Sequence, residues 1–367
     1  MENCDRSLKA QMCLFQPPTT WVDPPRTPAA SRFGSNRRVN RTPYTGRRGV
    51  HADSTSVTGL PVVHHPAYSA PQLPSGHRFP MGVFGRIHHL LLQEGLIQPT
   101  QVHCPAFLPS GDELQLVHDA QYVDRFCTGT LDAELERRIG FGEVTRQPIL
   151  IERTLAEVAG TLHTAELALQ CGLACNTAGG THHAFPAYGS GFCILNDLAF
   201  TARNLQRRGA VQRVLILDLD VHQGDGTAAI FEGDDSVFTL SVHAESNFPY
   251  RKQTSDLDVG LPDGTGDEAY LRQVGDVLPS VLSSFRPDLV LYDAGVDVHR
   301  DDKLGRLALT DDGLMRREMQ VLDTCLAAGI PIAGYVGGGY SSDLDVLAHR
   351  HSALHRAALQ MWQDYKL

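Results

Sequence analysis

Hydrophobic residues along this chain gather in short continuous runs instead of alternating with polar residues. Unbroken runs of β-branched and aliphatic residues are typical of strands that are buried on both faces. Five runs are predicted as strands, at 173–177, 214–219, 237–242, 289–292 and 332–336. Helical spacing of apolar residues predicts helices at 151–170, 197–208, 268–285 and 311–328. This alternation predicts an α/β domain with a central parallel sheet flanked by helices.

A polar or glycine-rich segment follows each predicted strand. In chain order these segments read AGGTHHAF, DLDVHQGDG, SVHAESNFP, DAGVDVHRDD and VGGGYSS. In sheets of this kind, ligands bind just beyond the carboxyl ends of the strands, which lie at one edge. We therefore expect the five segments to converge on a single active site at that edge.

The second of these segments has the residue types of a metal site. Asp218, Asp220 and His222 share one face of an extended segment, because side chains alternate with a period of two. Carboxylates and imidazoles bind zinc and similar divalent ions, and buried carboxylates are costly unless a cation compensates them. The DAGVD segment offers Asp297 as a third ligand and Asp293 as its rival, nearer the strand. We predict Asp220, His222 and Asp297, which leaves one position open, as catalytic sites do.

Two further segments supply groups for acid–base chemistry. His182 and His183 follow a Gly-Gly turn, and an imidazole is the natural general base for activating water. A carboxylate on the other ring nitrogen would fix the tautomer, and Asp218 and Asp225 are available for that purpose. Tyr340 follows three glycines and is predicted either to donate to a developing oxyanion or to pack beside a glycine turn.

Charge and cysteine content narrow the class of protein. The net charge is -10, and residues 53–367 carry 39 acidic against 23 basic side chains. Such an acidic body argues against a surface for nucleic acid. The apolar runs are too short to cross a membrane. The eight cysteines are scattered without a CxxC pair, which favours reduced thiols.

The N-terminal segment, residues 1–57, differs in composition from the rest. Residues 1–52 carry nine Lys or Arg and three Asp or Glu, and Pro, Ser and Thr are frequent. This composition predicts a disordered basic segment, and it is typical of a transit peptide for a plastid or mitochondrion. The alternative is a basic tail on a protein of the cytoplasm or nucleus. The catalytic domain is predicted to occupy residues 58–367.

Five motifs together resemble the histone deacetylase family, which has the arginase–deacetylase fold. They are GGTHHAF, GSGFCILND, LDLDVHQGDGT, YDAGVDVHRDDKLG and VGGGY, within a resemblance that spans about residues 60–365. The stretches HPAYSAPQLPSGHRFPM and DLDVGLPDGTGDEAYL are similar to the class IV branch and its bacterial and plant relatives. The chain has GGTHH in place of the arginase GGDH, which disfavours a site with two manganese ions.

The resemblance implies roles for individual residues. It implies that Asp220, His222 and Asp297 bind Zn²⁺. His182 and His183 would be the tandem catalytic histidines, with His183 as the principal proton shuttle. Tyr340 would polarise the amide carbonyl. Asp218 and Asp225 would pair with the two histidines. The expected substrate-binding residues are Gly191, Phe192, Phe248, Leu304 at the rim and Arg78 behind the metal. A K⁺ site would lie near Asp218 and Ser241.

The implied activity is hydrolysis of acyl-lysine in proteins by metal-activated water. One departure bears on the substrate: larger family members have an acidic residue in a rim loop, and here residues 139–147 offer only Glu143. Acetylated polyamines or other small acylated amines are therefore the alternative substrates. A second alternative is a deacetylase-like module that binds partners without catalysis.

Overall fold

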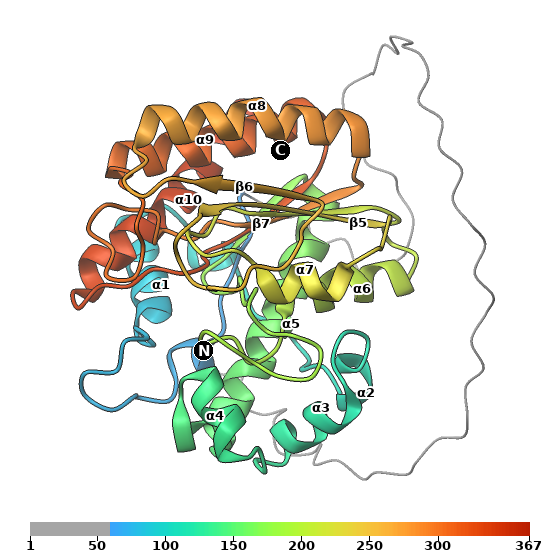
Figure 1. The fold of residues 1–367 in the computed structure, drawn as a ribbon. Coiled ribbons are helices and arrows are strands. Elements are labelled where there is room, and N and C mark those ends of the chain that lie inside the picture. The colour runs from blue at the N-terminus through green and yellow to red at the C-terminus, as the bar shows by residue number, and fades with distance from the viewer. Residues whose placement is uncertain (1–58) are drawn as a thin grey trace, which may run out of the picture. The chain divides into compact units, whose positions relative to one another are not determined.

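The computed structural model describes residues 59–367, which form one sheet of eight parallel strands with helices on both faces (Figure 1). Across the sheet the strand order is β2-β1-β3-β8-β7-β4-β5-β6, and each neighbouring pair is parallel. The strands are β1 (Val62–Val63), β2 (Val102–His103), β3 (Leu173–Asn176), β4 (Val214–Asp218), β5 (Val237–Ala244), β6 (Leu257–Leu261), β7 (Leu289–Asp293) and β8 (Ile332–Tyr335). The prediction of a parallel α/β sheet is confirmed.

Helices cover both faces of the sheet. They are α1 (Val83–Gln93), α2 (Gly111–Leu114), α3 (Ala120–Cys127), α4 (Ala133–Ile139), α5 (Pro148–Cys171), α6 (Asp197–Arg207), α7 (Asp225–Phe231), α8 (Asp267–Phe285), α9 (Asp311–Ala327) and α10 (Leu344–Tyr365). Three short 3₁₀ helices, η1 (Pro66–Ser69), η2 (Pro99–Gln101) and η3 (Gly142–Arg146), lie between them. Figure 1 shows α8 and α9 above the sheet, with α6 and α7 below it.

Side chains that alternate along the central strands join the sheet to both helix layers. On β8, the hydroxyl of Tyr335 donates to the carbonyl of Thr161 in α5, 2.9 Å away. The neighbouring Gly334 faces the opposite way, since a Cβ on it would lie 2.9 Å from Leu354 of α10. On β7, Tyr292 points to α9. The sheet is therefore buried on both faces, which explains the continuous hydrophobic runs.

The five predicted strands and four predicted helices are all present, with ends that differ by at most three residues. Sequence patterns missed three strands. β1 and β2 have only two residues each, and β6 lies at the sheet edge, where its outer positions are exposed. Such short or half-exposed strands have no long apolar run to mark them.

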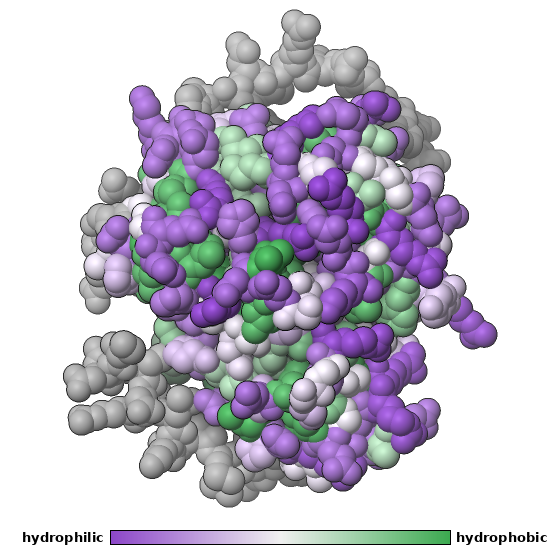
Figure 2. Space-filling model, turned by 90° about the vertical axis from the view of Figure 1, so that its left-hand side faces the viewer, coloured by the Kyte–Doolittle hydropathy of each residue, from purple (hydrophilic) through white to green (hydrophobic). Residues whose placement is uncertain are grey.

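The chain segments after the strands gather at the left of Figure 1, and Figure 2 shows this side from the front, mostly hydrophilic with small hydrophobic areas between. The predicted basic segment and transit peptide, residues 1–57, lie outside the described residues. Within residues 59–367, no helix combines the length and apolar character needed to cross a bilayer.

Candidate active site

Two clusters, each of one histidine and two aspartates, lie at and just beyond the carboxyl ends of β4 and β7. Asp220, His222 and Asp297 form the outer cluster, and His182, Asp218 and Asp293 form the inner cluster. In each cluster, one ligand atom per residue lies within 4.8 Å of the others, and all six residues are buried. The prediction that strand-end segments converge therefore agrees with the geometry.

In the outer cluster, a single imidazole nitrogen faces two carboxylates. Nδ1 of His222 lies 2.9 Å from Oδ1 of Asp220 and 3.1 Å from Oδ2 of Asp297. The other oxygens accept backbone N–H groups: Oδ2 of Asp220 from Gly338 at 2.8 Å, and Oδ1 of Asp297 from Val221 at 2.9 Å. These bonds leave three atoms, one on each side chain, directed at a common point.

The outer cluster has the electrostatics of a cation site. Burial, followed by the charge of Asp220, raises the pKa of Asp297 to about 7. Oδ2 of Asp297 is buried and accepts no hydrogen bond. A divalent ion between the three side chains would offset the repulsion of the two carboxylates, and one nitrogen with two oxygens suits zinc. The residues present therefore fit the metal that the sequence predicts.

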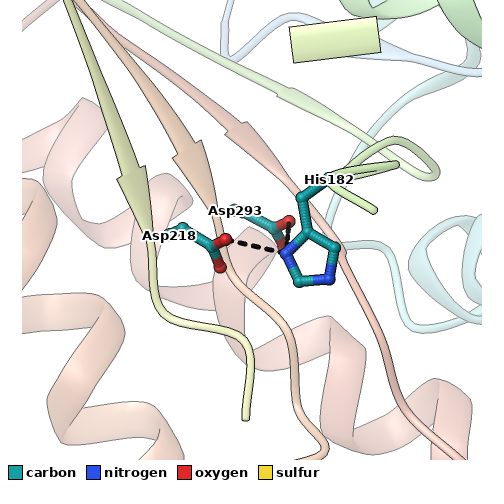
Figure 3. Close-up of side chains that lie close together, drawn as sticks. All are labelled: His182, Asp218 and Asp293. Atoms are coloured by element: carbon teal, nitrogen blue, oxygen red, sulfur yellow. Dashed lines mark hydrogen bonds and ion pairs between the residues drawn. The ribbon is translucent and has the colours of Figure 1, made fainter. Parts of the chain in front are cut away.

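The inner cluster is arranged differently (Figure 3). Asp218 and Asp293 are paired residues at the ends of β4 and β7. Nδ1 of His182 lies 2.7 Å from Oδ2 of Asp218 and 3.8 Å from Oδ2 of Asp293. Burial, followed by the charge of Asp218, raises the pKa of Asp293 well above its usual range. Here the imidazole is held by one carboxylate, and the second carboxylate stands behind it.

The tandem histidines each have their own carboxylate, as the sequence predicts, but their surroundings differ. Nδ1 of His183 lies 2.6 Å from Oδ1 of Asp225 at the start of α7. Burial lowers the pKa of His183 to about 4, with the charge of His182 acting in the same direction. For His182, burial is outweighed by Asp218 and Asp220, which raise its pKa well above the usual value. At neutral pH, His183 is thus the neutral imidazole of the pair.

Aromatic rings surround the outer cluster. The ring of Phe248 lies 4.9 Å from that of His183 and 6.4 Å from that of His222, measured between centroids. Tyr340 lies 6.4 Å from His222 and 6.1 Å from Phe192. The Tyr340 side chain is buried, and burial raises the pKa of its phenol well above 10, so its hydroxyl keeps its proton. The rings of Phe248 and Tyr340 therefore adjoin the imidazole of His222, and Phe192 lies beside Tyr340; Phe192 and Phe248 are called the aromatic walls below.

Gly191 lies close to both His183 and the Phe248 ring. Gly191 has φ of +53°, and a Cβ there would lie 2.6 Å from Cδ2 of His183 and 3.3 Å from Phe248. Phe192 itself has φ of 68°, an uncommon conformation for a bulky residue, and its N–H donates to the carbonyl of Ile139 at 2.7 Å. Any side chain larger than hydrogen at position 191 would enter the space between His183 and Phe248.

Leu304 and Arg78, two of the predicted substrate-binding residues, lie in different surroundings. Leu304 is half-buried, and its carbonyl accepts from Nδ2 of Asn247, the neighbour of Phe248, at 2.8 Å. Arg78, predicted behind the metal, is exposed instead, and its guanidinium carbon lies 5.9 Å from the centre of the Phe192 ring. His77 takes the inward position, stacked on Phe141. A guanidinium is buried only where acceptors surround it, as they do Arg317, and water solvates the charge of the exposed Arg78.

Sequence reasoning missed Asp302, which supports the tyrosine loop. Oδ2 of Asp302 accepts the N–H of Tyr340 at 2.6 Å, and Oδ1 accepts the N–H groups of Leu304 and Gly305 at 2.8 and 2.9 Å. It therefore joins the rim to the loop that carries the phenol. The signal was present in the sequence, because Asp302 belongs to the quoted motif YDAGVDVHRDDKLG.

Asp218 also lines a small cavity. Ser241 of β5, Thr227 of α7 and Gly224 contribute to the same cavity. Oγ of Ser241 lies 2.9 Å from Nδ1 of His243. The residues predicted for a K⁺ site are thus neighbours, at a distance from the aromatic walls.

Comparison with known proteins places this geometry in a family. Residues 77–356 match the histone deacetylase domain. An uncharacterized protein of Picosynechococcus sp. is 57% identical over 304 residues, covering 83% of this chain and all of that protein. Histone deacetylase 2 of Arabidopsis thaliana is 29% identical, covering 77% and 75%.

Two further similarities are to a bacterial protein and to a solved structure. Acetoin utilization protein AcuC of Staphylococcus aureus (strain Mu50) is 33% identical over 240 residues, covering 60% of this chain and 61% of that protein. The crystal structure of the HDA15 HD domain superposes with a TM-score of 0.67 at 21% identity, covering 84% of this chain and 94% of that one. That likeness concerns the fold alone. With most of its length matching the domain, the chain belongs to the histone deacetylase family.

Proposed function

We propose that this protein is a zinc-dependent hydrolase that removes acetyl or related acyl groups from the side-chain amine of lysine in proteins. One observation supports the proposal above all others. The Asp220–His222–Asp297 cluster is adjoined by a histidine–carboxylate pair and a buried phenol, between two aromatic walls.

Asp220, His222 and Asp297 would hold the metal. A divalent ion bound there supplies Lewis acidity, which polarises the amide carbonyl and lowers the pKa of water. His183 accepts the proton of the attacking water through Nε2, because its Nδ1 is bonded to Asp225. Water adds to the carbonyl carbon, the carbon–nitrogen bond breaks, and the amine leaves with a proton while the acyl group leaves as a carboxylate.

Tyr340 would donate a hydrogen bond to the carbonyl oxygen as negative charge develops on it. Its N–H bond to Asp302 at 2.6 Å holds the loop that presents the phenol. Phe192 and Phe248 would enclose the four-carbon stem of the acyl-lysine, whose apolar surface suits aromatic walls. A monovalent cation beside Asp218 and Ser241 would complete the inner part of the site.

A second substrate class is favoured by the rim. Residues 139–147 pack against Phe192, and Glu143 within η3 is their only acid. A rim with one carboxylate offers a peptide backbone few partners, so a small acylated amine such as an acetylated polyamine is the second candidate. Both candidates use the same residues for the chemical step.

The full-length protein, loaded with zinc, would be assayed against a panel of acyl-lysine peptides and acetylpolyamines. Release of carboxylate and free amine from the peptides with kcat/KM at least about tenfold above that for the polyamines supports the first candidate. The reverse ratio supports the second. Asp297→Ala is the control, and hydrolysis of both classes at the wild-type rate by this variant would refute the proposed site.

A further inference from the structure

Helix α9 carries an arginine–glutamate pair, Arg317 and Glu318, that is fully buried. Nε of Arg317 donates to Oε1 of Glu318 at 3.0 Å, and the hydroxyl of Tyr292 donates to Oε2 at 2.6 Å. The charge of the guanidinium is therefore balanced within the core. The pair belongs to none of the groups assigned to catalysis above.

The remaining donors of Arg317 reach three backbone carbonyls. Nη1 donates to the carbonyls of Leu219 at 3.2 Å and Gly295 at 2.8 Å, and Nη2 donates to that of Ala294 at 3.1 Å. Together with the bonds to Glu318, these contacts use all five N–H donors of the side chain. A planar, rigid fork of donors is required to reach so many acceptors at once.

The three carbonyls lie in the two loops that present the outer cluster. Leu219 immediately precedes Asp220, and Ala294 and Gly295 immediately follow β7 on the way to Asp297. β4 and β7 are adjacent strands, so one guanidinium bridges the loops from both. The hydroxyl of Tyr270 in α8 reinforces this bridge, since it also donates to the carbonyl of Leu219, at 3.3 Å.

The position of the bridge determines what it fixes. β4 and β7 are paired as far as Asp218 and Asp293. One more backbone hydrogen bond, from the N–H of Leu219 to the carbonyl of Asp293 at 3.0 Å, joins the two chain segments before the loops begin. A buried ion pair adds little net stability, because desolvation of both charges offsets their attraction. Its clearest physical effect here is to fix the geometry of the loops it contacts.

We infer that Arg317 is a positioning residue, which holds the loops of Asp220 and Asp297 in the relative placement that lets both carboxylates bind one metal ion. The inference rests on the proposed metal site. Groups outside the first ligand shell that orient ligands typically change metal affinity by about 10–100-fold when they are lost. Removing the bridge should therefore weaken zinc binding even when the protein stays folded.

The test measures zinc affinity of the full-length protein by competition with a chelator, alongside a melting curve. The Arg317→Met, Glu318→Leu double variant removes both charges and is expected to bind Zn²⁺ at least about tenfold more weakly than wild type. The matched control is Arg153→Met with Glu157→Leu. This pair on α5 is also buried, but within residues 59–367 the only backbone carbonyl to which Arg153 donates is that of Tyr68. The control should keep the zinc affinity of the wild type, because Arg153 does not contact the loops of Asp220 and Asp297.

A second variant covers the case in which the double variant does not fold. Arg317→Lys keeps the positive charge beside Glu318 but has one nitrogen, which cannot reach all three carbonyls. It too should bind zinc about tenfold more weakly. Co²⁺ in place of zinc should show an altered ligand-field absorption spectrum. Unchanged zinc affinity and an unchanged Co²⁺ spectrum in a folded Arg317 variant would overturn the inference.

The proposed function fails in a different way. If Asp297→Ala binds zinc as tightly as wild type, the metal site itself is misassigned, whatever Arg317 does. If Asp297→Ala loses zinc while the folded Arg317 variants retain it, the site stands and only the positioning role is lost.

Discussion

The outer and inner clusters have the same composition, one histidine and two aspartates, yet their geometry differs. In the outer cluster, Nδ1 of His222 is shared between Asp220 and Asp297 at 2.9 and 3.1 Å. In the inner cluster, Nδ1 of His182 is bonded to Asp218 at 2.7 Å, and Asp293 stands 3.8 Å away. The first arrangement directs three ligand atoms at one point, and the second orients an imidazole.

Distance from the strand ends accounts for this difference. Asp218 and Asp293 end their strands and are paired in register, so their carboxylates are fixed within the sheet. A Cβ on Gly337 would lie 2.0 Å from Oδ1 of Asp293, which shows how closely backbone covers this carboxylate. Asp220 and Asp297 lie further along the loops, beside the rings of His222, Tyr340 and Phe248. Identical side chains thus receive different roles from a shift of two to four residues.

The largest expected effect separates the two clusters directly. Asp297→Ala should weaken zinc binding by more than about 10²-fold. The loss of a ligand lowers metal affinity more than the loss of a group that only orients a ligand. Asp293→Ala should keep zinc and lower the melting temperature, since it removes a buried side chain at a strand end. Zinc content by elemental analysis and melting curves of both variants check this. Equal zinc content in Asp297→Ala and wild type would mean that the third ligand lies elsewhere.

The next effect concerns the imidazole that serves the outer cluster. His183→Ala should retain zinc and fold but lower turnover by about 10²–10⁴-fold, the usual contribution of proton transfer. Turnover and metal content are measured on the same sample. A zinc-loaded variant with the wild-type rate would show that His183 does not accept the proton, and His182 would then be the candidate base.

Tyr340 adjoins the outer cluster, so its loss should affect catalysis and leave the inner cluster intact. Tyr340→Phe should lower the single-turnover rate by about 10²–10³-fold, as for loss of one oxyanion donor. Packing and zinc content should be preserved because the ring remains. If the rate does not change at saturating acyl-lysine peptide, the hydroxyl does not face the reacting carbonyl.

The smallest effect lies furthest from the metal. Tyr250 is 85% exposed, and its ring lies 6.5 Å from that of Phe248, which in turn contacts His183. Stacking on a substrate outside the walls is worth about 1 kcal/mol for an aromatic pair, so Tyr250→Ala should raise KM about fivefold for peptides. The control is Phe107→Ala. Phe107 follows β2 in the chain, and its side chain is 83% exposed. A change in kcat instead of KM would contradict this role.

Sequence patterns predicted most of the fold and the chemistry of the site for identifiable reasons. Five strands form most of the sheet and are buried on both faces, so apolar residues follow one another along them. These strands are β3, β4, β5, β7 and β8. Helix α10 was missed because its 22 residues include three histidines and two arginines. Asp302 was overlooked although it belongs to the quoted motif, because its bonds to the N–H groups of Tyr340, Leu304 and Gly305 form only in the folded chain.

By itself, the sequence determined which chemical groups follow each strand and in what order, because that information is local. The spacing of Asp218, Asp220 and His222 brings three polar side chains to the end of one strand, whatever the partner strands are. Only the tertiary structure decided that Asp297 joins Asp220 while Asp293 joins Asp218, because this depends on the register of β4 against β7.

The tertiary structure also decided the surroundings of these groups. It placed Arg78 in solvent and buried Arg317 beneath both metal loops, where it reaches three carbonyls. Neither position has a signature along the chain, since an arginine is solvated or buried according to which acceptors the fold brings within its reach. Close approaches such as Gly338 to Asp220, 2.8 Å from N to Oδ2, likewise join residues 118 positions apart.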